Sequence, residues 1–378
     1  GLEEVQGEVL RHQFAELHER RLDFLWIGVP AAIISLAVAL WLVVDPLDDP
    51  PDLRSGENIA TIEEISDAGQ LVARANELVI ADALSRADLE TAFELCEQAA
   101  AMEPLNAEVW ATWSRICAAQ VFYRFDNTTE NKVRAEDFAA KAMRLDPESI
   151  EARYAQVNCW LTVTGSSDGF NPELFGQAFE MLEQMHAESP DDPRILQTLG
   201  GILASLPETR ERGMQMIDRL TRIPGWRERG WNGYGWMKFF AGEYDLAQEA
   251  ATKGLTDKNH PPILVLNSML AMHWTGDLDA ALAFLDRLSP STQREDWLLA
   301  LRVRLLMWRE EPAKILPLLN QHPREWIDSQ IFDGPKSWWI GEANRELNRP
   351  MAAEQSYQTT LRILDTRLRD TPQDPNLL

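Results

Sequence analysis

The sequence is poor in the residues and spacings that mark catalytic or metal-binding chemistry. Its 378 residues include three cysteines and six histidines. No cysteines form a CxxC pair, and no histidines have the HExxH spacing that places two metal ligands on one helix face. A phosphate-binding GxxxxGK[ST] loop and a GxSxG nucleophile elbow are also missing. We therefore predict no catalytic residue, no cofactor and no metal, and we expect neither enzymatic activity nor a small-molecule substrate.

Basic residues are few relative to acidic ones. The chain has 36 lysines and arginines against 60 aspartates and glutamates, for a formal net charge of -24. Nucleic-acid binding requires a clustered basic footprint, so we do not expect a nucleic-acid partner. The cysteines, Cys96, Cys117 and Cys159, fall on apolar positions of expected helices and are predicted to be buried.

Charge is missing altogether from one long run, Phe24 to Val44. As a helix, this run is long enough to cross a hydrocarbon core of ~30 Å. We predict a transmembrane helix over residues 22–44, in preference to a signal peptide or a buried soluble helix, because the run exceeds a signal core and no cleavage motif follows. Small residues would let this helix pack closely on other membrane helices: Gly28, Ala31, Ala32 and Ser35.

The flanks of this span differ in charge. Arginines precede it and aspartates follow it, which predicts a cytoplasmic N-terminus and an extracytoplasmic remainder, periplasmic in a bacterium. Residues 1–21 are expected to form an amphipathic segment, and residues 45–60 a linker rich in Pro and Asp. From residue 61 to 378, apolar residues recur at helical spacing, which predicts an all-α domain.

The stretch from Trp231 to Ala247 combines aromatic residues and glycines at the spacing W-x2-Y-G-x6-G-x-Y-x2-A. This spacing resembles the tetratricopeptide repeat, a helix-turn-helix unit of about 34 residues. The resemblance implies that Gly235 and Ala247 allow two antiparallel helices to approach closely, and that Gly242 makes the turn between them.

The same register recurs along the chain. "LETAFELCEQAAAMEP" and "AEDFAAKAMRLDP" each carry two spaced alanines before a proline. The resemblance covers residues 75–378 and implies about seven or eight hairpins. We therefore predict a tetratricopeptide-like helical-hairpin solenoid preceded by one transmembrane helix. Its packing positions are Trp231, Gly235, Gly242, Ala247, Gly200, Gly276 and Ala281.

Local signals refine this prediction. Asp191 and Asp192 follow a proline where a helix should begin, which indicates a helix cap. "FDGPKS", residues 332–337, is interpreted as a turn before the next helix. Most of the 14 tryptophans are expected to serve packing, including Trp110, Trp113, Trp231 and Trp274.

The resemblance also implies a concave groove for a protein partner, lined by the first helix of each hairpin. The matching positions are Arg115, Tyr154, Asn158, Arg229, Asn232, Trp236 and Phe239. The sequence departs from the family where "QVFYRFDNTTENKV" lengthens one loop, and the Lys and Asn clamp by which some relatives hold a peptide carboxylate is not reproduced.

The predicted function is that of a membrane-anchored scaffold with membrane-associated protein partners, plausibly an accessory subunit of a larger membrane complex. The alternative is the extracytoplasmic sensor half of a longer signalling protein with a catalytic or DNA-binding module before Gly1. The lack of an initiator Met motivates that alternative. An intact mass near 43.0 kDa would favour the scaffold.

Overall fold

A computed structural model describes residues 66–80, 85–164, 171–255, 260–329 and 331–370. The predicted segments 1–21, 22–44 and 45–60 lie outside this part of the chain, as do the membrane-helix residues listed above. Among the described residues, no helix is long and apolar enough to cross a membrane.

The described residues form sixteen α-helices and one short β-hairpin. The helices are α3 (Asp67–Ile80), α4 (Arg86–Met102), α5 (Ala107–Phe122), α6 (Thr129–Leu145), α7 (Ile150–Thr164), α8 (Pro172–Glu188), α9 (Pro193–Ser205), α10 (Arg210–Leu220), α11 (Arg227–Phe240), α12 (Tyr244–Gly254), α13 (Pro261–Leu270), α14 (Leu278–Asp286), α15 (Asp296–Trp308), α16 (Pro312–Gln321), α17 (Lys336–Glu346) and α18 (Pro350–Asp370). The strands are β1 (Trp326–Asp328) and β2 (Asp333–Pro335), which pair antiparallel.

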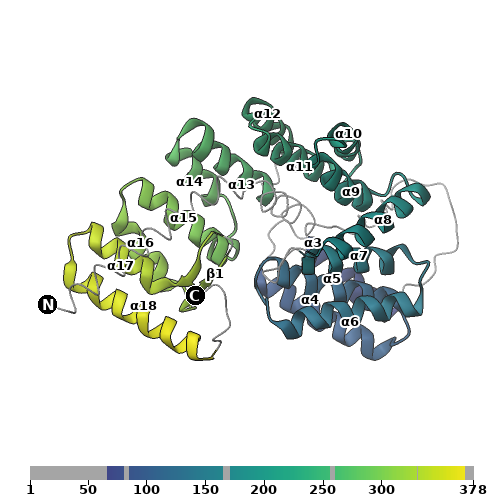
Figure 1. Cartoon of the computed structure of the whole chain (residues 1–378), viewed down its shortest axis with the longest axis horizontal. Helices are drawn as coiled ribbons and strands as arrows, with labels where there is room; N and C mark the ends of the chain where they lie inside the picture. The colour runs from purple at the N-terminus through teal and green to yellow at the C-terminus, as the bar shows by residue number, and fades with distance from the viewer. Residues whose placement is uncertain (1–65, 81–84, 165–170, 256–259, 330, 371–378) are drawn as a thin grey trace.

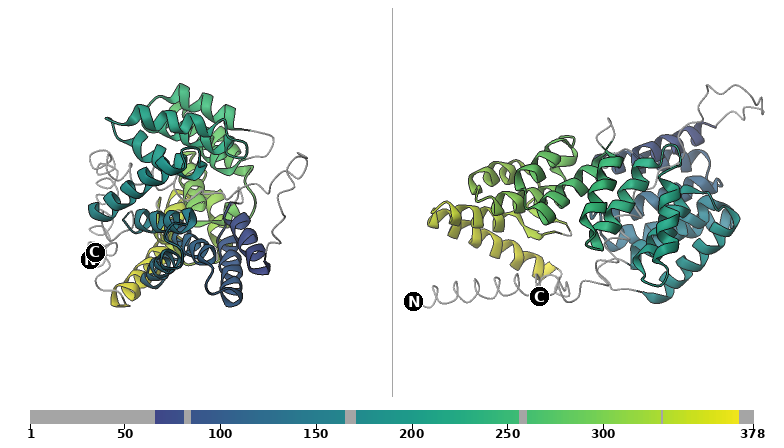
Figure 2. Two further views of the ribbon diagram at one scale, coloured as in Figure 1. Left: turned by 90° about the vertical axis from the view of Figure 1, so that its right-hand side faces the viewer. Right: turned by 90° about the horizontal axis from the view of Figure 1, so that it is seen from above.

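Consecutive helices pack as hairpins: α3 with α4, α5 with α6, and so on to α17 with α18. The first helices of neighbouring hairpins also pack on one another, as α3 does with α5, α5 with α7, α9 with α11, and α11 with α13. Figure 1 shows the hairpins following one another in an arc from the N-terminal helices over α9–α14 to α18, and Figure 2 shows this arc from two further sides. This arrangement confirms the predicted tetratricopeptide-like solenoid.

Local sequence signals explain where several helices begin. Asp192 caps α9 by accepting hydrogen bonds from the backbone N–H groups of Arg194 and Ile195, at 2.9 and 3.3 Å. This cap confirms the prediction for Asp192, whereas Asp191 instead accepts a hydrogen bond from Arg219. Proline occupies the first turn of α8, α9, α13 and α16, where its missing N–H would have no helical partner.

Small residues let the helices of a hairpin approach closely. Gly200 lies against Met216 of the paired helix, where an added Cβ would be 3.1 Å from the Met216 Cβ. Gly235 lies beside Leu266 and Ala250, and Ala247 and Ala281 are fully buried. The turn positions Gly242 and Gly276 have φ of 75° and 69°, a region that L-residues with a Cβ seldom adopt.

The tightest contacts with backbone atoms occur at two glycines that the repeat pattern did not single out. A Cβ on Gly213 would lie 2.5 Å from the Gly200 carbonyl oxygen and would overlap the Ala204 backbone. A Cβ on Gly230 would lie 2.6 Å from the Thr221 backbone nitrogen. Because these neighbours are backbone atoms, they cannot move aside as a flexible side chain can.

Two details differ from the sequence interpretation. Residues 333–335 form strand β2 rather than a simple turn. Trp274, which was expected to pack in the core, is 41% exposed. It belongs to a π-helical turn, Ala271–Thr275, whose wider i→i+5 spacing shifts the side-chain register. Trp110 and Trp113 are buried as predicted, and Trp231 is half-buried.

Substituting Gly213 tests the close backbone contact. Gly213→Ala should lower the free energy of unfolding by about 3 kcal/mol, because the new methyl group overpacks a fixed backbone. The control is Gly176→Ala, also within a helix, where nothing lies within 4 Å of an added Cβ. That variant should be about 0.5 kcal/mol more stable than the parent. Urea unfolding followed by circular dichroism measures both, and equal effects of the two substitutions would contradict the packing.

Candidate functional site

The residues predicted to line a concave groove lie on α5, α7 and α11. Six of the seven are buried, with exposures between 1% and 8%, and the seventh, Phe239, is half-buried. Their side chains therefore fill the space between helices rather than line an open channel. The structure gathers them into two groups, one on α5 and α7 and the other on α11.

The first group belongs to a network of charged and aromatic side chains. Arg194 contacts Glu151 at 2.6 Å and Asp192 at 2.8 Å, and Arg115 lies 3.9 Å from Glu151. Both guanidinium groups lie over the ring of Tyr154, 5.6 and 6.0 Å from its centroid. Because these charges are paired, neither guanidinium group is an isolated buried charge at the interface of α5, α7 and α9.

Hydrogen bonds complete this network. The Tyr154 hydroxyl lies 2.8 Å from Thr198 Oγ1. The Asn158 side chain donates to the Tyr154 carbonyl oxygen at 3.1 Å. Burial raises the pKa of nearby Glu108, and the neighbouring Glu151 charge adds to this effect. The three predicted residues of this group therefore have structural partners within the solenoid.

The second group lies along α11, which packs against α13. Arg229 lies over the Trp226 ring at 5.6 Å, and Trp236 packs edge-on against Phe239 with 5.5 Å between ring centroids. Burial, helped by the positive charge of Arg229, lowers the pKa of His260 to about 3. His260 is therefore neutral at physiological pH and cannot bind an anion as a cation would.

Residues from the two ends of the arc meet in a polar bridge, which consists of Arg86, Arg124, Glu295, Asp328 and Asp333. The Arg86 backbone N–H donates to Glu295 Oε1 at 3.0 Å. Arg124 forms ion pairs with Asp328 and, at 2.9 Å, with Asp333. These partners are 204 to 209 positions apart in the chain. The bridge therefore ties the beginning of the solenoid to its C-terminal part.

Arg124 occupies an unusual backbone position for its type. Its φ is 58°, a left-handed conformation that costs most residues about 1 kcal/mol and favours glycine. It follows α5, and the next residue closes the helix end through a hydrogen bond from Phe125 N–H to the Gln120 carbonyl oxygen at 2.9 Å. The ion pairs with Asp328 and Asp333 offset this local cost.

Asp296 anchors the hairpin that carries one half of the bridge. It is 3% exposed and accepts a hydrogen bond from the Asp328 backbone N–H at 2.9 Å. Its other oxygen lies 2.9 Å from both His322 Nε2 and an Arg324 nitrogen. The β-hairpin is thereby held to the start of α15, and Asp328 is positioned toward Arg124.

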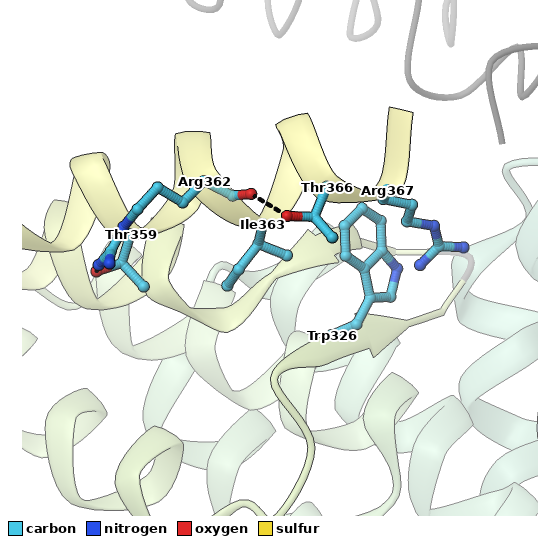
Figure 3. A pocket seen from close by; sticks show the side chains of 6 residues that line it. All are labelled: Trp326, Thr359, Arg362, Ile363, Thr366 and Arg367. Atoms are coloured by element: carbon cyan, nitrogen blue, oxygen red, sulfur yellow. Dashed lines mark hydrogen bonds between the residues drawn. The ribbon is translucent and has the colours of Figure 1, made fainter. Parts of the chain in front are cut away.

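A groove lies between β1 and the C-terminal half of α18 (Figure 3). It has a volume of about 540 Å³, and a second cavity of about 350 Å³ shares the lining residue Thr359 with it. We call the two cavities together the α18 groove. Its lining from α18 is Gln355, Ser356, Thr359, Arg362, Ile363, Thr366 and Arg367, and from other elements Asn320, Glu325, Trp326, Lys336, Ser337 and Ile340.

Unequal helix lengths create this groove. Helix α17 has 11 residues and its partner α18 has 21, so the C-terminal half of α18 extends past α17. Trp326 faces this extension, and the Arg367 guanidinium lies 3.9 Å from the centroid of its ring. The Trp326 indole N–H donates to Asp333 at 2.7 Å. Arg362 and Thr366 are exposed to solvent.

The sequence reasoning did not identify this groove or the polar bridge. No helical repeat pattern marks a three-residue strand, and residues 204 positions apart give no local signal of contact. The lengthened loop after α5 was recognised as a departure from the repeat, and it carries Arg124. The doubled length of the last helix, visible as an uninterrupted helical run from residue 350, was the other available signal.

Comparison with known proteins finds likenesses among solved structures. No protein-family model matches the chain, and no curated protein matches it. Among solved structures, a tetratricopeptide repeat protein from Parabacteroides merdae is 14% identical, with 75% of this chain and 98% of that chain covered and a TM-score of 0.40. Human IFIT1, in its dimer with m7Gppp-AAAA, is 11% identical, with 92% and 89% covered and a TM-score of 0.49. Yeast Tom70 is 10% identical, with 97% and 76% covered and a TM-score of 0.43.

Substituting Arg124 tests the polar bridge. Arg124→Gly removes both ion pairs but keeps the left-handed backbone, so it should open the two ends of the arc and increase the radius of gyration in X-ray scattering. The net loss of stability should be about 1–2 kcal/mol, between the values for exposed and buried pairs. Glu310→Gly is the control, since Glu310 has a similar φ of 56°. An unchanged radius of gyration in Arg124→Gly would contradict the bridge.

The buried carboxyl group of Glu295 predicts a pH dependence. Burial raises its pKa, which the hydrogen bond from Arg86 and the charges of Arg324 and Arg86 offset in part. The folded chain therefore binds this proton more tightly than the unfolded chain, and ionised Glu295 lowers stability above its raised pKa. That penalty disappears as the pH falls below the ordinary glutamate range.

Glu295→Gln should remove this penalty while the amide oxygen still accepts from Arg86. The variant should melt at a higher temperature than the parent at pH 7.5, and the difference should shrink as the pH approaches 4.5. Thermal unfolding across this pH range measures the effect, with exposed Glu94→Gln as the control. A variant that melts lower at pH 7.5 would show that the charge stabilises the bridge.

Proposed function

We propose that this protein is a membrane-anchored scaffold that holds a protein partner and has no catalytic role of its own. The α18 groove is the observation that carries this proposal. It is a solvent-accessible site at the end of a solenoid whose interior is filled by its own side chains. A scaffold of this form binds through a preformed rigid surface, which limits the entropy lost on association.

The architecture supports an interaction role. Helical solenoids bury a continuous core between neighbouring units and leave an extended surface for other molecules. Here the polar bridge ties the β1–β2 hairpin to the N-terminal hairpins, which would keep the groove at a constant position relative to them. The inner-face residues Arg115, Tyr154, Asn158, Arg229, Asn232, Trp236 and Phe239 would then support the scaffold, and the partner would bind at α18.

The proposed membrane attachment rests on the sequence of residues 22–44 and on the charges that flank them. The small residues of that run would pack against other membrane helices, which makes an accessory subunit of a membrane complex the preferred form of the scaffold. The solenoid would then lie outside the cytoplasm, with its groove close to the extracytoplasmic parts of the same complex.

Purification from native membranes tests the scaffold. After solubilisation in mild detergent, the tagged full chain should co-purify with a membrane protein at a fixed stoichiometry. A variant that lacks residues 1–44 should leave the membrane fraction and retain its helical circular dichroism spectrum, because the helices of the described residues pack on one another as consecutive hairpins. Recovery of the full chain without any stoichiometric partner, or in the soluble fraction, would overturn the proposal.

A further inference from the structure

The α18 groove has a charge pattern that is uncommon for this protein. The whole chain carries 60 acidic and 36 basic residues. None of the seven α18 residues that line the groove is acidic, whereas two are arginines. Helix α18 does contain three acidic residues, Glu354, Asp365 and Asp370, but they stand at other positions. The helix therefore directs its positive charge toward the groove.

The remaining lining suits a polypeptide. The hydroxyl groups of Ser356, Thr359 and Thr366 each donate to a carbonyl oxygen of α18 itself, so their oxygens can accept from peptide N–H groups, whereas the Gln355 amide can both donate and accept. Ile363 and the ring of Trp326 add apolar surface to the same groove. From Gln355 to Thr366 and Arg367, the lining follows about 18 Å of helix, which matches about five or six residues of an extended chain.

The two arginines are already oriented. Arg367 lies against the Trp326 ring at 3.9 Å, and Arg362 donates to Thr359 Oγ1 at 3.0 Å. A guanidinium carries five N–H donors in a planar fork that matches a carboxylate. The one carboxylate of the lining, Glu325, lies 3.2 Å from Lys336. Its charge is thus balanced within the groove.

We propose that the α18 groove binds an extended acidic segment of a partner protein, with carboxylates on Arg362 and Arg367 and apolar side chains against Ile363 and Trp326. This inference rests on the proposed scaffold function and names the chemistry of its partner. Two arginines are too small a basic footprint for nucleic acid, particularly on a chain with a net charge of -24. If this chain and its partner were attached to the same membrane, the effective concentration of the partner would rise, which would offset the repulsion between two acidic proteins.

Peptide binding to the full chain in detergent tests this proposal. The probes are three fluorescein-labelled octapeptides, in which leucine alternates with glutamate, glutamine or lysine. The glutamate peptide should bind to the parent chain, and the glutamine and lysine peptides at least about tenfold more weakly. The double variant Arg362→Glu and Arg367→Glu should bind the glutamate peptide at least about tenfold more weakly than the parent chain does.

A matched variant controls for charge on the same helix. Arg369→Glu changes an exposed arginine that pairs with Asp365, at 3.7 Å, outside the groove, and should leave peptide binding within about twofold of the parent. The single variant Arg362→Gln, at an exposed position, keeps the test valid if the double variant unfolds, and should weaken binding about threefold. Melting curves monitor the fold of each variant.

The outcomes separate the groove from the scaffold. The acidic-segment proposal would be overturned if the control Arg369→Glu lost as much affinity for the glutamate peptide as the double variant. Equal binding of the glutamate and lysine peptides to the parent chain would also overturn it. The proposal would also be overturned if anionic lipid vesicles or single-stranded RNA bound through these arginines and the glutamate peptide did not. If the native partner co-purifies equally with the parent and with the double variant, the scaffold stands and the groove proposal falls.

Discussion

Close approach of helix backbones is the constraint on which this solenoid depends. At Gly213 and Gly230, main-chain atoms of one helix lie where a side chain would otherwise stand. Alanines that are almost fully buried serve the same purpose in the first hairpins. The first helices of successive hairpins also pack on one another. Single arginine and aromatic side chains, such as Arg115 and Tyr154, are buried between these helices.

The polar residues of the solenoid are therefore of two kinds. Arg115, Arg194 and Tyr154 have partners inside the solenoid, so they specify how three helices pack. Arg362 and Arg367 lie where α18 continues past α17, and their groove faces solvent. A buried charge whose hydrogen bonds are already made within the fold gains little from a ligand, whereas an oriented charge at an open groove can gain more. This difference favours α18 over the interior of the solenoid as the place where the proposed partner would bind.

The helical repeat could be predicted because it is local. Gly235, Gly242 and Ala247 fall within one helix-turn-helix unit, and their spacing reports contacts between adjacent segments. That residues such as Tyr154 lie on the first helix of a hairpin followed from the resemblance to the repeat. The burial of these residues could not be predicted in the same way, because it depends on the curvature of the array, which accumulates over many hairpins. Trp274 differed because a π-helical turn breaks the 3.6-residue period. No local sequence pattern predicts the contact between Arg124 and Asp328.

The polar bridge has a consequence for how the chain folds during synthesis. In an open repeat array, each unit depends on its neighbours alone, so early hairpins are complete as soon as they emerge. Here Arg124 must wait for partners 204 and 209 positions later, by which time most of the solenoid has left the ribosome. The N-terminal hairpins therefore spend this interval without the ion pairs of Arg124. Synthesis of the β1–β2 hairpin, rather than of the early repeats alone, is the step after which the polar bridge can form.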